Sequence, residues 1–272
     1  MTRLLRELLI GFLICGLTFT GFMGCSEDGT GGEAEQPPEL PPNASMTVDL
    51  STFGGEKLAP ELQIPGANFS NAAIRVLLVN TAVIVGLALP TAAFKAAIDT
   101  DPIKQGDGSW LWSYEITILG VDIEANLTGR LDLAGLKTVW SMRVTSNFLL
   151  LSNFEWYTGE SLLDNSSGSW LFYDSKAPGS GNELAKIEWA VSAIDKVDLI
   201  ISNLELEGPN ANDVLLYSID GTTAFISFYK ASDDTLVDIT WDLITIAGSI
   251  LAPNYNGGER ASWDGDKQDI VP

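Results

Sequence analysis

The residues best suited to chemistry are carboxylates that stand beside tryptophans in the sequence. Four such pairs occur, and they are Glu155-Trp156, Glu188-Trp189, Trp241-Asp242 and Trp263-Asp264. Sugars stack on tryptophan rings, and a pair of carboxylates can hydrolyse a glycosidic bond without histidine. Adjacent residues of a strand point to opposite faces, however, so an acid and its neighbouring tryptophan would not share a pocket. We therefore expect the tryptophans to pack in the core, and a glycan-active enzyme is the weakest functional alternative.

Three aspartates lie close together in the stretch WDGDKQD near the C-terminus. Asp264, Asp266 and Asp269 offer oxygen ligands of the kind that calcium prefers. An EF-hand loop would need a different spacing and a later bidentate glutamate. We expect an irregular, solvated acidic tail over residues 253–272, with a calcium site as the alternative.

The residue types that are absent exclude several functional classes. The chain of 272 residues has no histidine and two cysteines. Ser-His-Asp and Cys-His nucleophiles and zinc sites built from histidine and cysteine are therefore excluded. Lys and Arg number 15 against 36 Asp and Glu, a net charge of −21, so we expect no nucleic-acid partner. No motif indicates a cofactor or a catalytic residue, and the sequence predicts a protein that is not an enzyme.

The N-terminus has the layout of a secretory signal peptide. Two arginines among the first seven residues precede an almost uncharged, apolar run over residues 8–23. The run ends in Phe22-Met23-Gly24-Cys25, which resembles the lipobox of bacterial lipoproteins, although Phe22 replaces the usual leucine. The resemblance implies that residues 1–24 are a signal peptide, that cleavage falls between Gly24 and Cys25, and that Cys25 carries acyl chains.

The same resemblance implies that the protein is located in the cell envelope. Several acyl chains on Cys25 would hold the protein durably on a membrane, because two or more chains bind far more stably than one. Ser26 stands where an aspartate would favour the inner membrane, which implies the outer membrane. Ser26-Glu27-Asp28 also resembles a short acidic signal for export to the cell surface. The alternative is that these acids only keep a linker soluble, so periplasmic and surface orientations both remain open.

A tether is expected to follow the lipidation site. Residues 25–44 are rich in glycine, proline and glutamate and lack periodic apolar positions, which is typical of disordered chain. Residues 45–272 are long enough to bury a core of their own. We expect them to form a single α+β domain, helical over 68–100 and mainly β over 108–252.

The stretch from Ser70 to Thr100 is rich in alanine, leucine and valine and predicts a helix, with Ser70 and Asn71 as candidate N-caps. Pro90 should kink this helix or begin a second one. Residues 76–94 contain no charge and are long enough to cross a membrane. We expect a buried helix rather than a membrane span, because a second anchor would be redundant.

Beyond Gly108 the sequence changes to alternation of apolar and polar residues. In residues 110–118, Trp110, Trp112 and Tyr114 share one face of a half-buried strand. Further strands are indicated within residues 121–133, 140–144, 154–156, 170–172, 187–191, 197–201, 214–217, 222–230 and 235–246. About nine or ten strands in succession, joined by short turns such as Asp220-Gly221, predict an antiparallel meander.

The expected fold is α+β, a helix followed by a curved antiparallel β-meander that wraps on it. This architecture is similar to that of periplasmic lipid-carrier and lipocalin-like proteins, at the level of the fold alone. Together with the lipobox resemblance, this architecture predicts a lipid-anchored outer-membrane or surface lipoprotein. Its folded domain would be a non-enzymatic binding or carrier domain for a hydrophobic small molecule. Trp110, Trp112 and Tyr114 are the candidate ligand-facing aromatics. The alternative is a structural lipoprotein that contacts another envelope protein and has no pocket. A cavity beside the helix would favour the carrier.

Overall fold

The computed structural model describes residues 36–53, 65–79, 85–193 and 196–271. The chain divides into two compact units, Met1–Gln36 and Pro37–Pro272, and the second contains all the helices and strands described below. The predicted signal peptide, its cleavage site at Gly24 and the lipidation site Cys25 lie outside the described residues.

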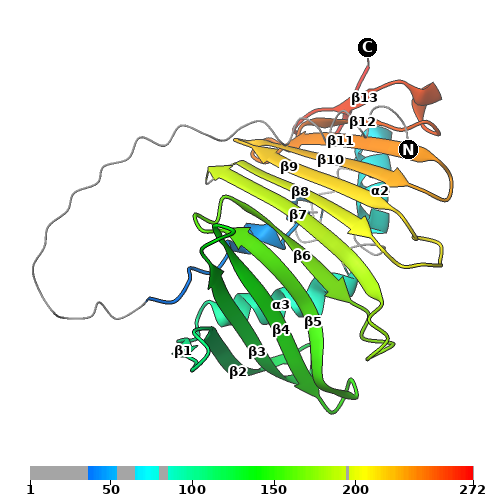
Figure 1. Cartoon of the computed structure of the whole chain (residues 1–272). Coiled ribbons are helices and arrows are strands. Elements are labelled where there is room, and N and C mark those ends of the chain that lie inside the picture. The colour runs from blue at the N-terminus through cyan, green and yellow to red at the C-terminus, as the bar shows by residue number, and fades with distance from the viewer. Residues whose placement is uncertain (1–35, 54–64, 80–84, 194–195, 272) are drawn as a thin grey trace, which may run out of the picture. The chain divides into compact units, whose positions relative to one another are not determined.

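One antiparallel sheet dominates the folded unit, and its strands follow one another in chain order (Figure 1). Within the described residues it contains fourteen strands, each paired with its neighbours in sequence. They are β1 (Ile103–Lys104), β2 (Trp110–Ile118), β3 (Val121–Asp132), β4 (Lys137–Ser146), β5 (Leu151–Leu162), β6 (Ser167–Tyr173), β7 (Glu183–Ala193), β8 (Lys196–Asn203), β9 (Val214–Asp220), β10 (Thr223–Lys230), β11 (Thr235–Asp242), β12 (Gly248–Leu251), β13 (Ala261–Trp263) and β14 (Asp269–Ile270). The antiparallel meander predicted from alternation is thus confirmed.

The ten stretches that alternate in sequence correspond to β2–β11, and the estimate of nine or ten strands was too low. The additional strands β1, β12, β13 and β14 have two to four residues each. Runs this short are too brief for a period of two to be recognised. Because β13 and β14 lie within residues 253–272, the expectation of an irregular tail was wrong for these segments.

Two helices, not one, occupy the region predicted to be helical. They are α2 (Ala67–Val79) and α3 (Ala88–Ala97), and residues 80–84 between them lie outside the described part of the chain. Pro90 lies in the first turn of α3, where a missing N–H costs nothing. Neither helix, nor any other in the described residues, has the length and apolar character needed to cross a membrane.

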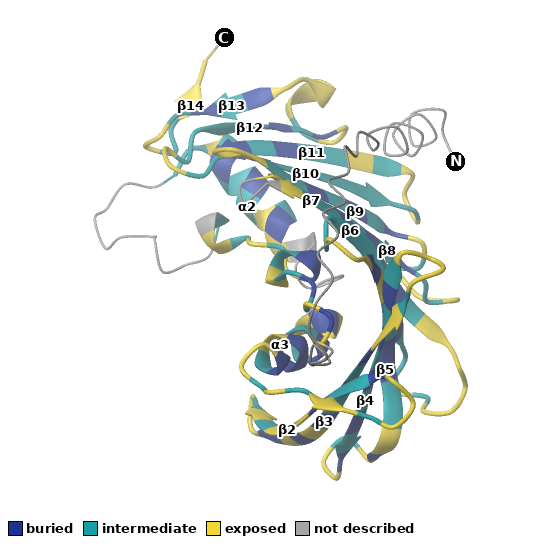
Figure 2. Ribbon diagram, turned by 60° about the vertical axis from the view of Figure 1, so that its left-hand side comes forward, coloured by how far each residue is buried: buried dark blue, intermediate teal, exposed yellow. Residues whose placement is uncertain are grey.

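Both helices pack on the concave face of the curved sheet, as Figure 2 shows. Helix α3 packs on β2 and β3, whereas α2 packs on β12, β13 and β14. The ring of Phe94 in α3 meets the ring of Trp170 in β6 edge to face, with the centroids 5.4 Å apart. The hydrophobic core therefore lies between the concave face and the helices.

The N-terminal segment, residues 37–53, also lies on the concave face. The indole N–H of Trp170 donates to the buried Ser45 hydroxyl at 3.1 Å. The ring of Phe53 packs edge to face on Trp241, with the centroids 5.0 Å apart. The folded unit begins at Pro37. Its first eight residues therefore belong to the domain, although composition had placed them in the tether.

The tryptophans form the centre of the core, as predicted. Seven of the eight are at most 4% exposed, namely Trp112, Trp140, Trp156, Trp170, Trp189, Trp241 and Trp263. Four of their rings cover a glycine on the neighbouring strand, in the cross-strand pairs Gly129–Trp140, Gly159–Trp170, Gly168–Trp189 and Gly248–Trp263. A side chain at these glycines would occupy the space that the rings fill. The four pairs therefore favour the alignment of neighbouring strands in which each of these tryptophans faces a glycine.

Candidate functional site: a cleft between helix α2 and strands β10 and β11

A cleft of about 190 Å³ lies between α2 and the concave face of β10 and β11. Its floor consists of side chains from directly opposed residues, which share one face of the sheet. Ile226 opposes Ile239, and both are 1% exposed. Phe228 opposes Val237, and both are half-buried. The floor is therefore apolar, and its residues change from buried at Ile226 and Ile239 to half-buried at Phe228 and Val237.

Helix α2 contributes Val76, which is buried, and Arg75, which is half-buried, to the other side of the cleft. The Arg75 guanidinium donates to the side-chain oxygen of Asn71 at 3.0 Å and to that of Asn254 at 2.7 Å. Its Cζ atom lies 5.7 Å from the centroid of the Tyr255 ring. These partners orient the cation, and all of them are electrically neutral.

Lys230 and Thr235 continue the floor at its polar end, where they oppose each other. The Lys230 ammonium lies 2.8 Å from the Asp233 carboxylate, and this hydrogen bond raises the pKa of Lys230 and lowers that of Asp233. Asp213 also acts on Lys230 electrostatically. The lining thus combines apolar side chains with two cations and one exposed acid.

Asp213, beside this end of the cleft, is a buried carboxylate. One of its oxygens accepts the N–H of Ala231 at 2.9 Å, and the other has no hydrogen-bond partner among the described residues. Burial raises the pKa of Asp213, because the charged form loses its hydration.

Wider depressions occur as well, and the two of about 930 and 730 Å³ are lined by no residue of α2 or α3. The first is lined by Glu115, Asp122 and Glu124 together with Phe148, and is acidic. The second lies beside β5 and the loop that follows β6. We favour the smaller cleft as a ligand site because it lies between a helix and the sheet and its floor includes the core residues Ile226 and Ile239.

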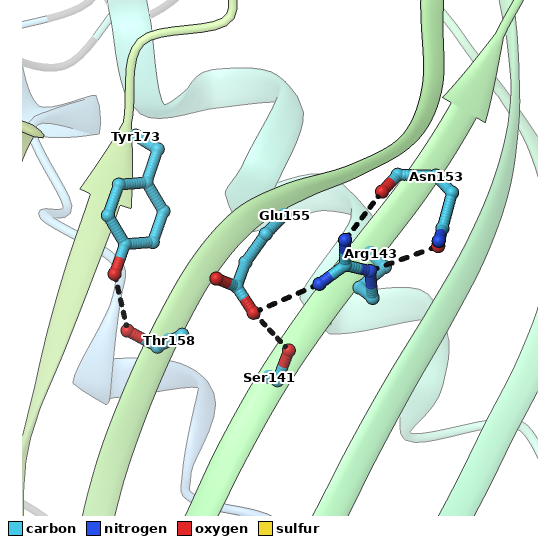
Figure 3. A network of polar contacts seen from close by, with 6 residues as sticks. All are labelled: Ser141, Arg143, Asn153, Glu155, Thr158 and Tyr173. Atoms are coloured by element: carbon cyan, nitrogen blue, oxygen red, sulfur yellow. Dashed lines mark hydrogen bonds and ion pairs between the residues drawn. The ribbon is translucent and has the colours of Figure 1, made fainter. Parts of the chain in front are cut away.

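Figure 3 shows the polar contacts around the second depression. The Glu155 carboxylate accepts hydrogen bonds from the Arg143 guanidinium at 3.3 Å and from the Ser141 hydroxyl at 3.0 Å. Tyr173 and Thr158 share a hydrogen bond of 3.3 Å nearby. Trp156, the sequence neighbour of Glu155, is buried in the core. This acid and its tryptophan therefore do not form a common sugar site.

The structure places the predicted ligand-facing aromatics on β2, the strand that packs against α3. Trp112 is buried against Trp140, with the ring centroids 5.8 Å apart, and Trp110 is half-buried. The Tyr114 hydroxyl donates to the backbone oxygen of Ala93 in α3, and burial raises its pKa. The three residues lie together, but the cleft beside α2 is lined by other side chains.

Two of the three aspartates considered for calcium accept hydrogen bonds within the fold. Asp269 accepts the backbone N–H groups of Ala67 and Asn68 at the start of α2. Asp264 accepts the N–H groups of Asp266 and Gln268 within a turn. No group of three acidic, histidine or cysteine side chains positioned for a metal occurs in the described ranges.

The cleft residues were not singled out from sequence, although one signal for Arg75 was present. Arg75 is the one charged residue between Glu61 and Lys95, in a stretch that otherwise reads as a buried helix. A charge inside such a helix indicates either the edge of the core or a specific function. Its approach to β10 and β11 depends on how the helix packs and has no signal in the sequence.

Comparison of this chain with protein-family models, with curated protein sequences and with solved structures finds no match.

Proposed function

We propose that this chain is a lipid-anchored envelope lipoprotein whose folded unit binds a hydrophobic ligand in the cleft beside α2. The observation that carries the proposal is the cleft itself, because its apolar floor reaches the core between a helix and the sheet. Ligand pockets typically combine an apolar lining with a few polar groups that orient the ligand, and this cleft has both. The lipobox resemblance at Phe22-Met23-Gly24-Cys25 supports the anchor and the outer-membrane or surface location.

Photocrosslinking with an uncharged probe tests the ligand site. The full chain, in isolated membranes of a bacterial host that produces it, is irradiated with a decyl alcohol that carries a diazirine. We expect crosslinks on peptides from α2, β10 and β11. Crosslinks confined to other parts of the folded unit would contradict the proposal.

Two variants make this test specific. Val237→Trp fills the floor of the cleft and should abolish crosslinking there. Val139→Trp introduces the same change at a half-buried valine of β4 and should leave crosslinking unchanged, because Val139 lies outside the cleft. Equal crosslinking in both variants would place the probe somewhere other than the cleft.

The anchor is tested through Cys25. Labelled palmitate should enter the wild-type chain and be absent from Cys25→Ala, which should also keep the unprocessed length of the precursor. Normal processing and labelling of Cys25→Ala would rule out the lipobox interpretation.

A second candidate function, contact with another envelope component, is favoured by exposed apolar residues at two adjacent hairpin turns. Leu119, between β2 and β3, is 88% exposed, and Leu150, between β4 and β5, is 85% exposed. Both have positive φ, a conformation that is strained for leucine. Crosslinks of the decyl probe at these turns, with none in the cleft, would support this alternative.

A further inference from the structure

Arg75 is a half-buried cation without an acidic partner among the described residues. The ion pairs in that part of the chain involve Lys137, Arg143, Lys186, Lys196 and Lys230. The hydrogen bonds of Arg75 go instead to amide and backbone oxygens of Asn71 and Asn254. A guanidinium has five N–H donors in a planar fork, so these contacts leave capacity for a further acceptor.

The missing partner is unexpected in so acidic a protein. The chain has 36 acidic and 15 basic residues, yet two acids in this region, Asp233 and Asp269, have other roles. Asp233, which also lines the cleft, pairs with Lys230. Asp269, which with Arg75 acts electrostatically on Tyr255, accepts the first N–H groups of α2. A partly desolvated cation is costly unless an anion accompanies it, so the site is complementary to an anionic group.

The apolar part of the lining indicates what that anionic group is attached to. Beside Arg75 the cleft presents Val76, Ile226, Phe228, Val237 and Ile239, which offer apolar surface and no hydrogen bonds. Its volume of about 190 Å³ is below the ~300–1,000 Å³ of pockets that enclose a drug-sized ligand. The cleft therefore fits one narrow apolar chain, and a bulky or two-chain lipid would exceed it.

We infer that the ligand of this cleft is a single-chain anionic amphiphile, whose carboxylate or phosphate head pairs with Arg75 while its chain lies on the floor of β10 and β11. This inference rests on the proposed function, since it specifies the ligand class of the same site. Arginine suits such a head because its fork can bind two oxygens of a carboxylate or a phosphate at once.

Competition against the uncharged diazirine probe tests the inference on the full chain in membranes. The competitors are decanoate, decyl phosphate, decanol and decyltrimethylammonium, which differ only in the head group. We expect decanoate or decyl phosphate to compete at concentrations about tenfold lower than decanol, the factor typical of one charge-assisted hydrogen bond. Whichever of the two anions competes better identifies the head as carboxylate or phosphate.

Arg75 variants separate the head group from the chain. In Arg75→Gln the advantage of the anions over decanol should fall below about twofold, whereas Arg75→Lys, which keeps the charge, should retain part of it. Arg260→Gln, which removes an exposed arginine that bonds to Ser249, is the matched control. Partition of each competitor into lipid is the same for every variant, so it cancels when the ratios are compared.

The outcomes distinguish the two proposals. If the probe does not crosslink in the cleft, the proposed function fails. If it does, but decanol or decyltrimethylammonium competes as well as the anions do in the wild type, the hydrophobic site stands and the inference about the anion is wrong. Should Arg75→Gln fail to fold, the wild-type comparison of the competitors and the Arg75→Lys result still decide the question.

Discussion

The Asp269 carboxylate accepts the backbone N–H of Asn68 at 2.8 Å, across 201 residues of sequence. Its second oxygen accepts the N–H of Ala67 at 3.1 Å. The first N–H groups of a helix have no partner within the helix, and a negative charge there is also favoured by the helix dipole. The last strand of the sheet thus caps the helix that covers the candidate cleft.

We predict that Asp269→Ala destabilises the folded unit by about 1 kcal/mol, the usual cost of losing an N-terminal cap. Urea denaturation followed by tryptophan fluorescence measures the change. Asp266→Ala is the matched control, because no hydrogen bond to the Asp266 carboxylate occurs among the described residues, and its effect should stay within about 0.5 kcal/mol. Equal losses of stability in the two variants would contradict the capping role of Asp269.

Gly159→Ala should destabilise the protein because Trp170 occupies the space beside this glycine. A Cβ atom at Gly159 would overlap ring atom Cε3 of Trp170 and would lie 2.6 Å from the backbone oxygen of Ser169. Overpacking of a core typically costs about 1–3 kcal/mol. Gly106→Ala, with nothing within 4 Å of the added carbon, is the control in the same urea experiment. A Gly159→Ala midpoint equal to that of the control would show that the ring moves aside freely.

Asp213 should make the wild-type protein less stable as the pH rises above about 4. Burial raises its folded pKa, so the folded state holds this proton to higher pH than the unfolded state, whose pKa is about 3.9. The stability that this protonated carboxyl contributes is complete at low pH and is lost as the pH rises through the folded pKa.

Asp213→Asn removes this titration, so its stability relative to the wild type should increase between pH 4 and the folded pKa and then level off. Urea midpoints of both proteins at several pH values from 3 to 7 measure the difference. A difference between the two proteins that does not vary with pH would show that Asp213 titrates normally.

Asp242 should have the opposite effect at acid pH. Its carboxylate accepts the backbone N–H groups of Thr245 and Ile244 and the hydroxyl of Thr222, and these bonds lower its pKa to about 2. Because the folded pKa is depressed, the associated stability is present above about pH 4, where the unfolded carboxyl is ionised, and is lost as the pH falls towards 2.

Asp242→Asn should therefore be less stable than the wild type at pH 6 and approach it as the pH falls from 4 to 2. Thermal unfolding followed by circular dichroism across this range is the measurement, with Asp101→Asn, at an exposed aspartate, as the control. A constant gap between Asp242→Asn and the wild type would show that the loss comes from the turn geometry and not from the charge.

Local patterns predicted most of the sheet. Alternation in residues 110–118, for example, put Trp112 and Tyr114 on the inner face, and the structure agrees. Each side chain in a strand is directed by its own position in the pleat, so this information is present in consecutive residues. The four shortest strands were not predicted, because a period of two cannot be recognised in so few residues.

Helix boundaries and the start of the folded unit were less predictable. Helix α2 begins at Ala67, before the expected caps Ser70 and Asn71, because Asp269 supplies the capping group from the far end of the chain. The proline-rich composition of residues 37–44 is typical of a tether, yet this segment packs with the sheet. Contacts between distant segments override local composition in both cases.

The sequence by itself determined the antiparallel meander, the tryptophan core and the exclusion of histidine and cysteine chemistry, because alternation and residue type are properties of the chain alone. It also carries the lipobox resemblance at Cys25. Only the tertiary structure decided that Arg75 meets Phe228 and Val237 in one cleft. These residues come from a helix and two strands far apart in the chain, and their meeting depends on where the helix packs on the concave face, which no local pattern encodes.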